Sequence, residues 1–193
     1  GYADVLPYFK RCENKIGAGE DNYRGKTGNL IINDLEWRDP LCDAFIRGAN
    51  SVGIPLNSDY NGAKQEGVSY VQRTTHKRRR VSAARAFLNP ARKRSNLKII
   101  TNAHVTKVIL EKKRSVGVMF KKGSQSSTFL ELRANKEVIL SGGAINSPQL
   151  LQLSGIGPSD LLKKHGIEVQ HELSGVGLNL RDHYAPRFTA RAK

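Results

Sequence analysis

The sequence has few of the residues that mark a secreted, membrane-bound or metal-binding protein. Cys12 and Cys42 are its only two cysteines, which excludes a disulfide framework and gives no metal-ligand spacing. No apolar run approaches the roughly 20 residues needed to span a bilayer, and the N-terminus lacks the layout of a secretory signal. We therefore expect a cytoplasmic protein with reduced thiols, no transmembrane segment and no metal.

Acidic residues are also scarce. Asp and Glu number 17 against 32 Lys and Arg, so the formal net charge is +15. Residues 67–110 contain eleven Lys or Arg and no acid, a field that attracts polyanions. No aromatic side chain interleaves residues 77–80 to stack on bases. We favour a solvated face, or a charge balanced by acidic residues elsewhere, and expect no nucleic-acid partner, while a basic nucleic-acid-binding module stays open as an alternative.

The first half of the chain predicts short helices separated by loops. Hydrophobic content of 38% and charged content of 25% indicate a globular chain with one domain and part of a second. The patterns predict helices at 4–12, 40–49 and 82–88, and Pro90 is expected to end the last of them. A polar loop is expected at 13–27 and a strand at 28–33.

The second half predicts mainly strands. Short strands are expected at 97–100, 105–110, 115–120 and 128–133, with a charged turn at 111–114, so three of them in succession form a β-meander. Residues 137–140 are nearly all apolar, which is typical of a strand buried on both faces. An apolar helix with Pro148 in its first turn follows, and then a helix at 158–165.

Small residues lie between that apolar strand and that helix. Glycines there let the backbone approach a ligand closely, and the helix start offers free N–H groups and a positive dipole end. The bend is therefore a candidate cofactor site, with a purely structural turn as the alternative.

The sequence of this bend and helix resembles a known family. Residues 143–157 read Gly-Ala-Ile-Asn-Ser-Pro-Gln-Leu-Leu-Gln-Leu-Ser-Gly-Ile-Gly, which is similar to the second signature of the glucose–methanol–choline (GMC) oxidoreductases. Further segments resemble the family in the same order, at 4–9, 59–67, 80–88 and 175–183. The resemblance covers nearly the whole chain and is greatest to the bacterial choline and alcohol dehydrogenases, of which the chain looks like an internal piece.

The resemblance implies an α/β fold that is only partly present. Residues 97–193 would be part of a Rossmann-like FAD-binding domain with the β-meander and the signature. Residues 1–96 would mix elements of the substrate-binding domain with the edge of the FAD-binding domain. A partial sheet leaves apolar surface uncovered, so we expect the isolated chain to be poorly stable and to bind FAD weakly or not at all.

The implied activity is oxidation of the CH–OH group of an alcohol, choline or another primary alcohol. In the family the cofactor is FAD, and a hydride passes from the alcohol carbon to flavin N5. The electron acceptor stays open between oxygen and a quinone or other carrier. The family's catalytic His pair lies beyond this chain, and its Gly-x-Gly-x-x-Gly fingerprint is absent, so we expect no catalytic residue here. An inactive remnant is a further alternative.

The resemblance also assigns site residues. Val105 matches a position whose backbone contacts the adenine of FAD, with an ordinary strand valine as the alternative. Small residues at the bend would lie beside the cofactor, and a loop near 180 would lie toward the flavin, although a structural role for His183 is as well supported. Two turn residues would face the substrate cavity, with a solvated turn as the alternative. The cofactor candidates are Val105, Gly142, Gly143, Ala144, Asn179, Asp182 and His183, and the substrate candidates are Gln65 and Glu66.

One departure from the family concerns the turn before residue 80. The family has a glycine near Arg78, where this chain has only Lys and Arg. If that glycine has a positive φ, the replacement strains the backbone by about 1 kcal/mol.

Overall fold

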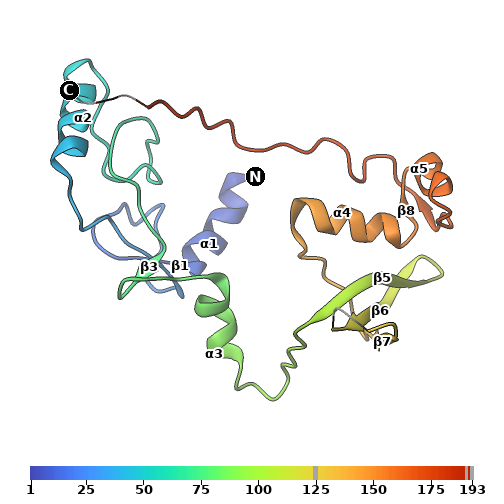
Figure 1. Ribbon diagram of the computed structural model, residues 1–193. Helices are drawn as coiled ribbons and strands as arrows, with labels where there is room; N and C mark the ends of the chain where they lie inside the picture. The colour runs from blue at the N-terminus through green and yellow to red at the C-terminus, as the bar shows by residue number, and fades with distance from the viewer. Residues whose placement is uncertain (124–125, 190, 192–193) are drawn as a thin grey trace. The chain divides into compact units, whose positions relative to one another are not determined.

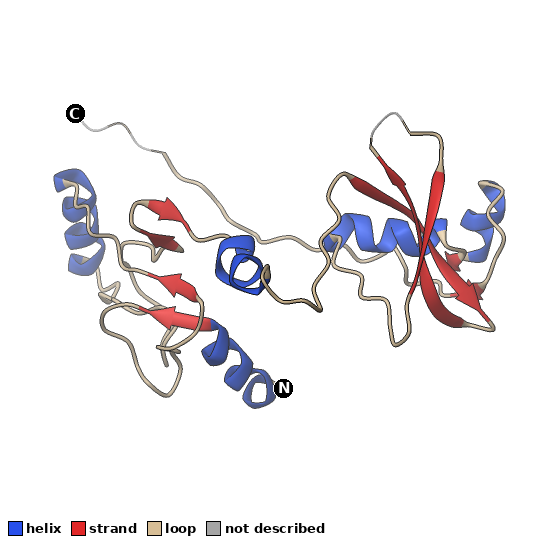
Figure 2. Cartoon of the chain, turned by 90° about the horizontal axis from the view of Figure 1, so that it is seen from below, coloured by secondary structure: helices blue, strands red, loops and turns tan. Residues whose placement is uncertain are grey.

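The computed structural model describes residues 1–123, 126–189 and 191. The chain divides into two compact units, residues 1–98 and 99–193. Each unit combines short helices with small sheets (Figures 1 and 2), which confirms the mixed α/β class. None of the helices within the described ranges has the length and apolarity that crossing a lipid bilayer requires.

The first unit is built around two small two-stranded sheets. One is a parallel pair that follows the first helix directly, and the other is a tight antiparallel hairpin. The second helix begins at Asp39, whose carboxylate accepts the N–H groups of Leu41 and Cys42. In chain order the elements are α1 (Tyr2–Cys12), β1 (Glu13–Lys15), β2 (Leu30–Ile32), α2 (Pro40–Ser51), β3 (Thr75–His76), β4 (Arg79–Arg80), the π-helix η1 (Ala84–Leu88) and α3 (Asn89–Ala91).

Three local predictions for this unit were wrong. Residues 13–15 form β1 rather than loop, although no apolar residue marks the strand, because the buried ammonium of Lys15 pairs with Asp34 at 2.8 Å. The third helical segment continues through Pro90 to Ala91, since proline is tolerated in the first turn of α3. Residues 97–100 are not a strand, and nothing in the described part of the chain pairs with them.

A buried arginine ties distant parts of the first unit together. Arg24 donates Nε to Glu13 Oε2 at 3.0 Å and Nη2 to Glu13 Oε1 at 2.6 Å. Its Nη1 donates to Gln72 Oε1 at 3.0 Å and to Asp59. Burial lowers the pKa of Arg24, but the hydrogen bonds and attraction of the two carboxylates raise it above its ordinary value. The guanidinium therefore stays charged at every working pH.

The second unit is an antiparallel meander with one helix across it. The sheet order is β5-β6-β7, as predicted, and α4 lies against the sheet at β5 (Figures 1 and 2). A short parallel pair and a two-turn helix complete the unit. In chain order the elements are β5 (Ala103–Glu111), β6 (Arg114–Lys122), β7 (Phe129–Arg133), α4 (Gly143–Leu153), β8 (Ile156–Gly157), α5 (Ser159–Lys164) and β9 (His171–Glu172).

One hydroxyl joins α4 to the sheet. Ser154, at the C-terminal end of α4, is fully buried. Its Oγ accepts the N–H of Val108 on β5 at 2.8 Å and donates to the carbonyl of Leu150 at 2.6 Å. Since an unpaired buried N–H costs about 1–3 kcal/mol, the signature serine fixes helix and strand in one register.

Two predictions near the bend were wrong. Residues 137–140 are extended but unpaired, and Ile139 is 76% exposed rather than buried. The described residues contain no strand beside this segment, so its backbone has no ladder to join. The helix begins at Gly143, which places Pro148 inside it rather than in its first turn.

The chain exposes a large area for its mass. Its accessible surface is 15,792 Å², whereas two separate globular domains of half its mass would together expose about 11,000 Å². The uncovered apolar surface that we expected is present in both units. It includes Leu41 and Phe45 on α2 and Phe129, Leu132 and Ile145 in the second unit.

Two hairpin tips hold lysine or arginine in a backbone conformation that favours glycine. His76 pairs with Arg79, so Lys77 and Arg78 form a two-residue loop, and their φ values are 47° and 61°. Lys112 and Lys113, between β5 and β6, have φ values of 47° and 67°. Positive φ at both loop residues defines the type I′ turn, which prefers Asn-Gly. Arg78 thus meets the condition, a positive φ, under which the replacement of glycine strains the backbone.

We expect Arg78→Gly to stabilise the first unit by about 1 kcal/mol, because glycine adopts the left-handed conformation without the Cβ penalty. Urea denaturation followed by the fluorescence of Trp37, the only Trp in the sequence, would measure the change. Arg47→Gly, in the interior of α2, is the control and should destabilise the unit by about 1 kcal/mol. A lower urea midpoint for Arg78→Gly than for the parent chain would contradict the turn assignment.

Candidate cofactor site

A cavity of about 440 Å³ lies beside the bend in the second unit. Its size is within the range of small-molecule sites. Residues of β5, β6 and α4 and the extended segment before α4 form its walls. Most of the lining is apolar, with a few polar groups among them. The lining consists of Ala103, His104, Val105, Val118, Val138, Ile139, Leu140, Ser141, Gly142, Asn146, Ser147, Gln149, Leu150 and Leu153.

The bend itself presents backbone groups to the surroundings. The N-terminus of α4 has no side-chain cap, so its first N–H groups are available to an oxygen or nitrogen acceptor. Gly143 has a φ of +86°, and a Cβ there would meet nothing within 4 Å. Ser147 Oγ accepts the N–H of Gly142 at 3.0 Å and so holds the bend in shape. These features fit a phosphate or the edge of a planar cofactor.

The structure brings some of the predicted cofactor residues together. Val105, on β5, and Gly142 line the same cavity. Gly143 and Ala144 follow Gly142 in the first turn of α4 and are exposed. The bend is therefore not packed inside the unit, and room for a ligand exists beside it.

The remaining cofactor candidates lie in the C-terminal segment and do not line this cavity. Asn179, Asp182 and His183 are exposed and belong to no helix or strand. Asn179 has a φ of 58°, and the backbone N–H of His183 donates to Asp182 Oδ1 at 2.7 Å. This is the only hydrogen bond among the described residues in which Asn179, Asp182 or His183 takes part.

Sequence reasoning assigned no site role to the five polar residues that line the cavity, His104, Ser141, Asn146, Ser147 and Gln149. His104 precedes Val105 on β5, and Asn146 and Gln149 face the cavity from α4. Asn146 and Gln149 stand three positions apart, which places them on one face of a helix. That spacing inside the signature was the available signal, whereas nothing in the sequence marked His104.

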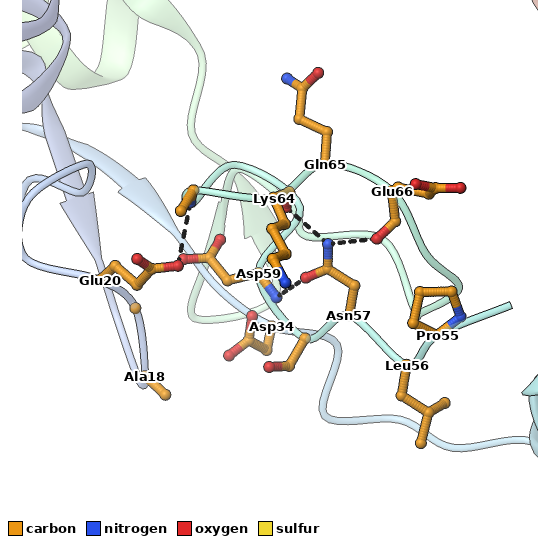
Figure 3. Close-up of a pocket in the computed structure, with 13 residues that line it drawn as sticks. Ala18, Glu20, Asp34, Pro55, Leu56, Asn57, Asp59, Lys64, Gln65 and Glu66 are labelled. Atoms are coloured by element: carbon orange, nitrogen blue, oxygen red, sulfur yellow. Dashed lines mark hydrogen bonds between the residues drawn. The ribbon is translucent and has the colours of Figure 1, made fainter.

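The predicted substrate residues line a larger cavity, in the first unit (Figure 3). Its volume is about 1020 Å³. Asn57 organises its rim, because its Nδ2 donates to the carbonyls of Lys64 at 2.8 Å and Glu66 at 3.1 Å. Gln65 and Glu66 are exposed, and the side chain of Gln65 extends away from Asn57 in Figure 3. The Asn57 side chain thus holds the turn through backbone carbonyls, and the side chains of Gln65 and Glu66 take no part in these bonds.

Asp59 contributes a buried carboxylate to the same cavity. Its Oδ1 pairs with Arg24, while its Oδ2 is buried and has no hydrogen-bond partner among the described residues. A Cβ on Gly19 would lie 3.3 Å from this oxygen, so glycine keeps the space beside it open. Within the described ranges, no three His, Cys, Asp or Glu side chains gather as metal ligands would.

The fold and the cavity together define the class of protein. It has a mixed α/β region in which the uncapped start of a helix lies beside a mainly apolar cavity. The family model of the GMC oxidoreductases matches residues 1–185. The chain belongs to the GMC oxidoreductase family.

Among known proteins, the chain is similar to bacterial oxygen-dependent choline dehydrogenases. It is 49% identical over 182 residues to that of Brucella anthropi, which covers 94% of this chain and 32% of the relative. It is 45% identical over 182 residues to that of Sinorhizobium fredii, with the same coverage. The chain therefore spans about a third of the length of the curated relatives it matches.

The fold of the chain is also similar to that of solved oxidoreductase structures. An FAD-dependent oxidoreductase from Chaetomium thermophilum superposes with a TM-score of 0.84 at 28% identity, over 90% of this chain and 32% of the other. Pyridoxine 4-oxidase from Mesorbium loti superposes with a TM-score of 0.81 at 33% identity, over 90% of this chain and 34% of the other.

Proposed function

We propose that the chain is part of an FAD-dependent oxidoreductase that acts on the CH–OH group of a choline-like primary alcohol. Similarity to oxygen-dependent choline dehydrogenases supports the substrate class, and a structural relative described as FAD-dependent supports the cofactor. The observation that carries the proposal is the cavity in which Val105 and Gly142 meet beside the uncapped start of α4.

The chain's own part in this function is to hold and orient the cofactor and the alcohol. FAD, when bound, supplies the acceptor for the hydride from the alcohol carbon. We assign to Val105, Gly142, Gly143 and Ala144 the wall against the cofactor, where small side chains let backbone N–H groups reach its oxygen atoms. Exposed Asn179, Asp182 and His183 would close the flavin side. Gln65 and Glu66 would face the alcohol, and no residue of this chain is assigned the proton transfer.

The 193-residue chain alone should bind FAD weakly or not at all. Pocket sites enclose most of a ligand's surface, whereas Ile139 on the cavity wall is 76% exposed. After incubation with excess FAD and gel filtration, we expect no absorbance near 450 nm to elute with the chain. Stoichiometric flavin in that peak would mean that these residues already form a complete site.

A chimera tests the function itself. The corresponding 182 residues of the Brucella anthropi choline dehydrogenase would be replaced by those of this chain, which are 49% identical. If the proposal holds, the chimera retains FAD and oxidises choline. Because Gly143 and Gly53 both have a positive φ, 86° and 92°, and open space at the Cβ position, Gly143→Val and Gly53→Val form a matched pair, and only the first should lower flavin content. A folded chimera without flavin would favour the inactive-remnant alternative.

A further inference from the structure

A second cavity in the first unit has no role in the function proposed above. Its volume is about 470 Å³, and it lies between β2, the β3–β4 hairpin and η1. Its floor is apolar and includes the buried side chains of Val81 and Ala86. Asn29, Ile31 and Pro90 also line it. Both the volume and the apolar floor are typical of small-molecule sites.

Basic groups form the rim of this cavity, which we call the basic cavity. His76, Lys77, Arg79 and Arg85 line it, and no acidic residue does. In the described part of the first unit, the salt bridges of the carboxylates are made by Lys15, Arg24, Lys26 and the N-terminus. Lys77, Arg79 and Arg85 therefore form no salt bridge with a carboxylate in the described part of this unit, and a field of such cations concentrates anions. Arg85 Nη1 donates to the carbonyl of Arg80 at 3.1 Å, which holds the guanidinium at the rim.

Two uncommon backbone features converge on the same cavity. Arg85 and Ala86 belong to η1, and π-helices are rare and occur frequently at functional sites. Lys77 has a φ of 47°, and strained non-glycine residues also cluster at ligand sites. Each of the two features thus contributes a basic residue, Lys77 or Arg85, to the lining of one cavity.

We propose that the basic cavity binds an amphiphilic organic anion. The anionic head, a phosphate or carboxylate, contacts Arg79, Arg85 and Lys77, because charge-assisted hydrogen bonds are the strongest that these groups make. The apolar or planar body of the ligand covers Val81 and Ala86. All the residues that line this site belong to the first unit, and none of them lines the cavity assigned to FAD.

The probe is 1-naphthyl phosphate, titrated into the full 193-residue chain by isothermal calorimetry. We expect saturable binding, weaker by about tenfold or more in Arg79→Gln/Arg85→Gln, which removes two charge-assisted contacts. The matched control, Arg92→Gln/Lys93→Gln, removes the same charge from exposed residues outside the lining and should bind within about twofold of the parent chain. Circular dichroism confirms that both variants are folded.

Two further ligands test the charge and the apolar body of the ligand separately. 1-Naphthol, which lacks the charge, and inorganic phosphate, which lacks the apolar body, should each bind at least about tenfold more weakly, because each makes half of the contacts. If both double variants lose the same affinity for 1-naphthyl phosphate and binding depends steeply on salt, the chain attracts anions diffusely. That result would overturn the proposed site. Absence of binding, or phosphate binding as tightly as the naphthyl ester, would overturn it as well.

Discussion

Replacing Arg24 with Met is expected to unfold residues 1–98. The substitution leaves Glu13 and Asp59 without their cation, although their side chains are only 15% and 13% exposed. Breaking a buried pair in this way costs about 3–5 kcal/mol, a large part of the about 5–15 kcal/mol that stabilises a typical domain. Urea denaturation monitored through Trp37 would show the loss as a much lower midpoint.

Two variants distinguish the effect of the lost ion pairs from a nonspecific effect of substitution on stability. Arg47→Met changes an exposed residue of α2 and should shift stability by less than about 0.5 kcal/mol. The triple variant Arg24→Met, Glu13→Gln, Asp59→Asn removes the unpaired charges and should recover part of the loss. If Arg24→Met alone unfolds at the parent midpoint, the buried network does not hold the first unit together.

Replacing Gly155 with Ala is expected to disrupt the second unit. Gly155 has a φ of +85°, and a Cβ there would lie 2.4 Å from the backbone oxygen of Glu168. The carbonyl of Gly155 also accepts the N–H groups of Gln170 and His171, so the backbone cannot shift freely. Left-handed strain of about 1 kcal/mol and overpacking of about 1–3 kcal/mol add to about 2–4 kcal/mol.

The control is Gly166→Ala, which isolates the steric part. Gly166 also has a positive φ, 68°, but a Cβ there would meet nothing within 4 Å. It should therefore lose only about 1 kcal/mol. Hydrogen exchange of peptides from residues 99–189, measured by mass spectrometry, reports this unit without a Trp. Equal protection in the two variants would contradict the close contact between Gly155 and Glu168.

Local patterns predicted the elements whose signal lies within a few residues. The meander follows from alternating strands around a charged turn at 111–114, and α2 follows from Pro40 and an apolar face. β1 has no such signal, since Lys15 is buried only because Asp34 neutralises it. The apolar run at 137–140 predicts a buried strand, but burial needs neighbouring strands that the described residues do not provide.

The candidate site was predictable in part. Val105 and Gly142 were named from the resemblance to the family, and the structure places both at one cavity. Arg24 could not be found in this way, because Glu13, Asp59 and Gln72 stand 11, 35 and 48 positions from it. Only the fold brings these charges together. The basic cavity likewise depends on the curvature of η1 and the left-handed hairpin turn, and neither is marked by residue type.

The two outer strands of the meander differ in their readiness to recruit another chain. On β5 the N–H of Val108 is occupied by Ser154, so a foreign strand could not add there without displacing α4. Every residue of β7 is exposed, and no strand of the described ranges pairs with its outer edge, which is the arrangement from which intermolecular sheets grow. Aggregation of isolated chains should therefore start at β7. Leu132→Lys should reduce this aggregation, because a charged side chain on an edge strand opposes the addition of another strand.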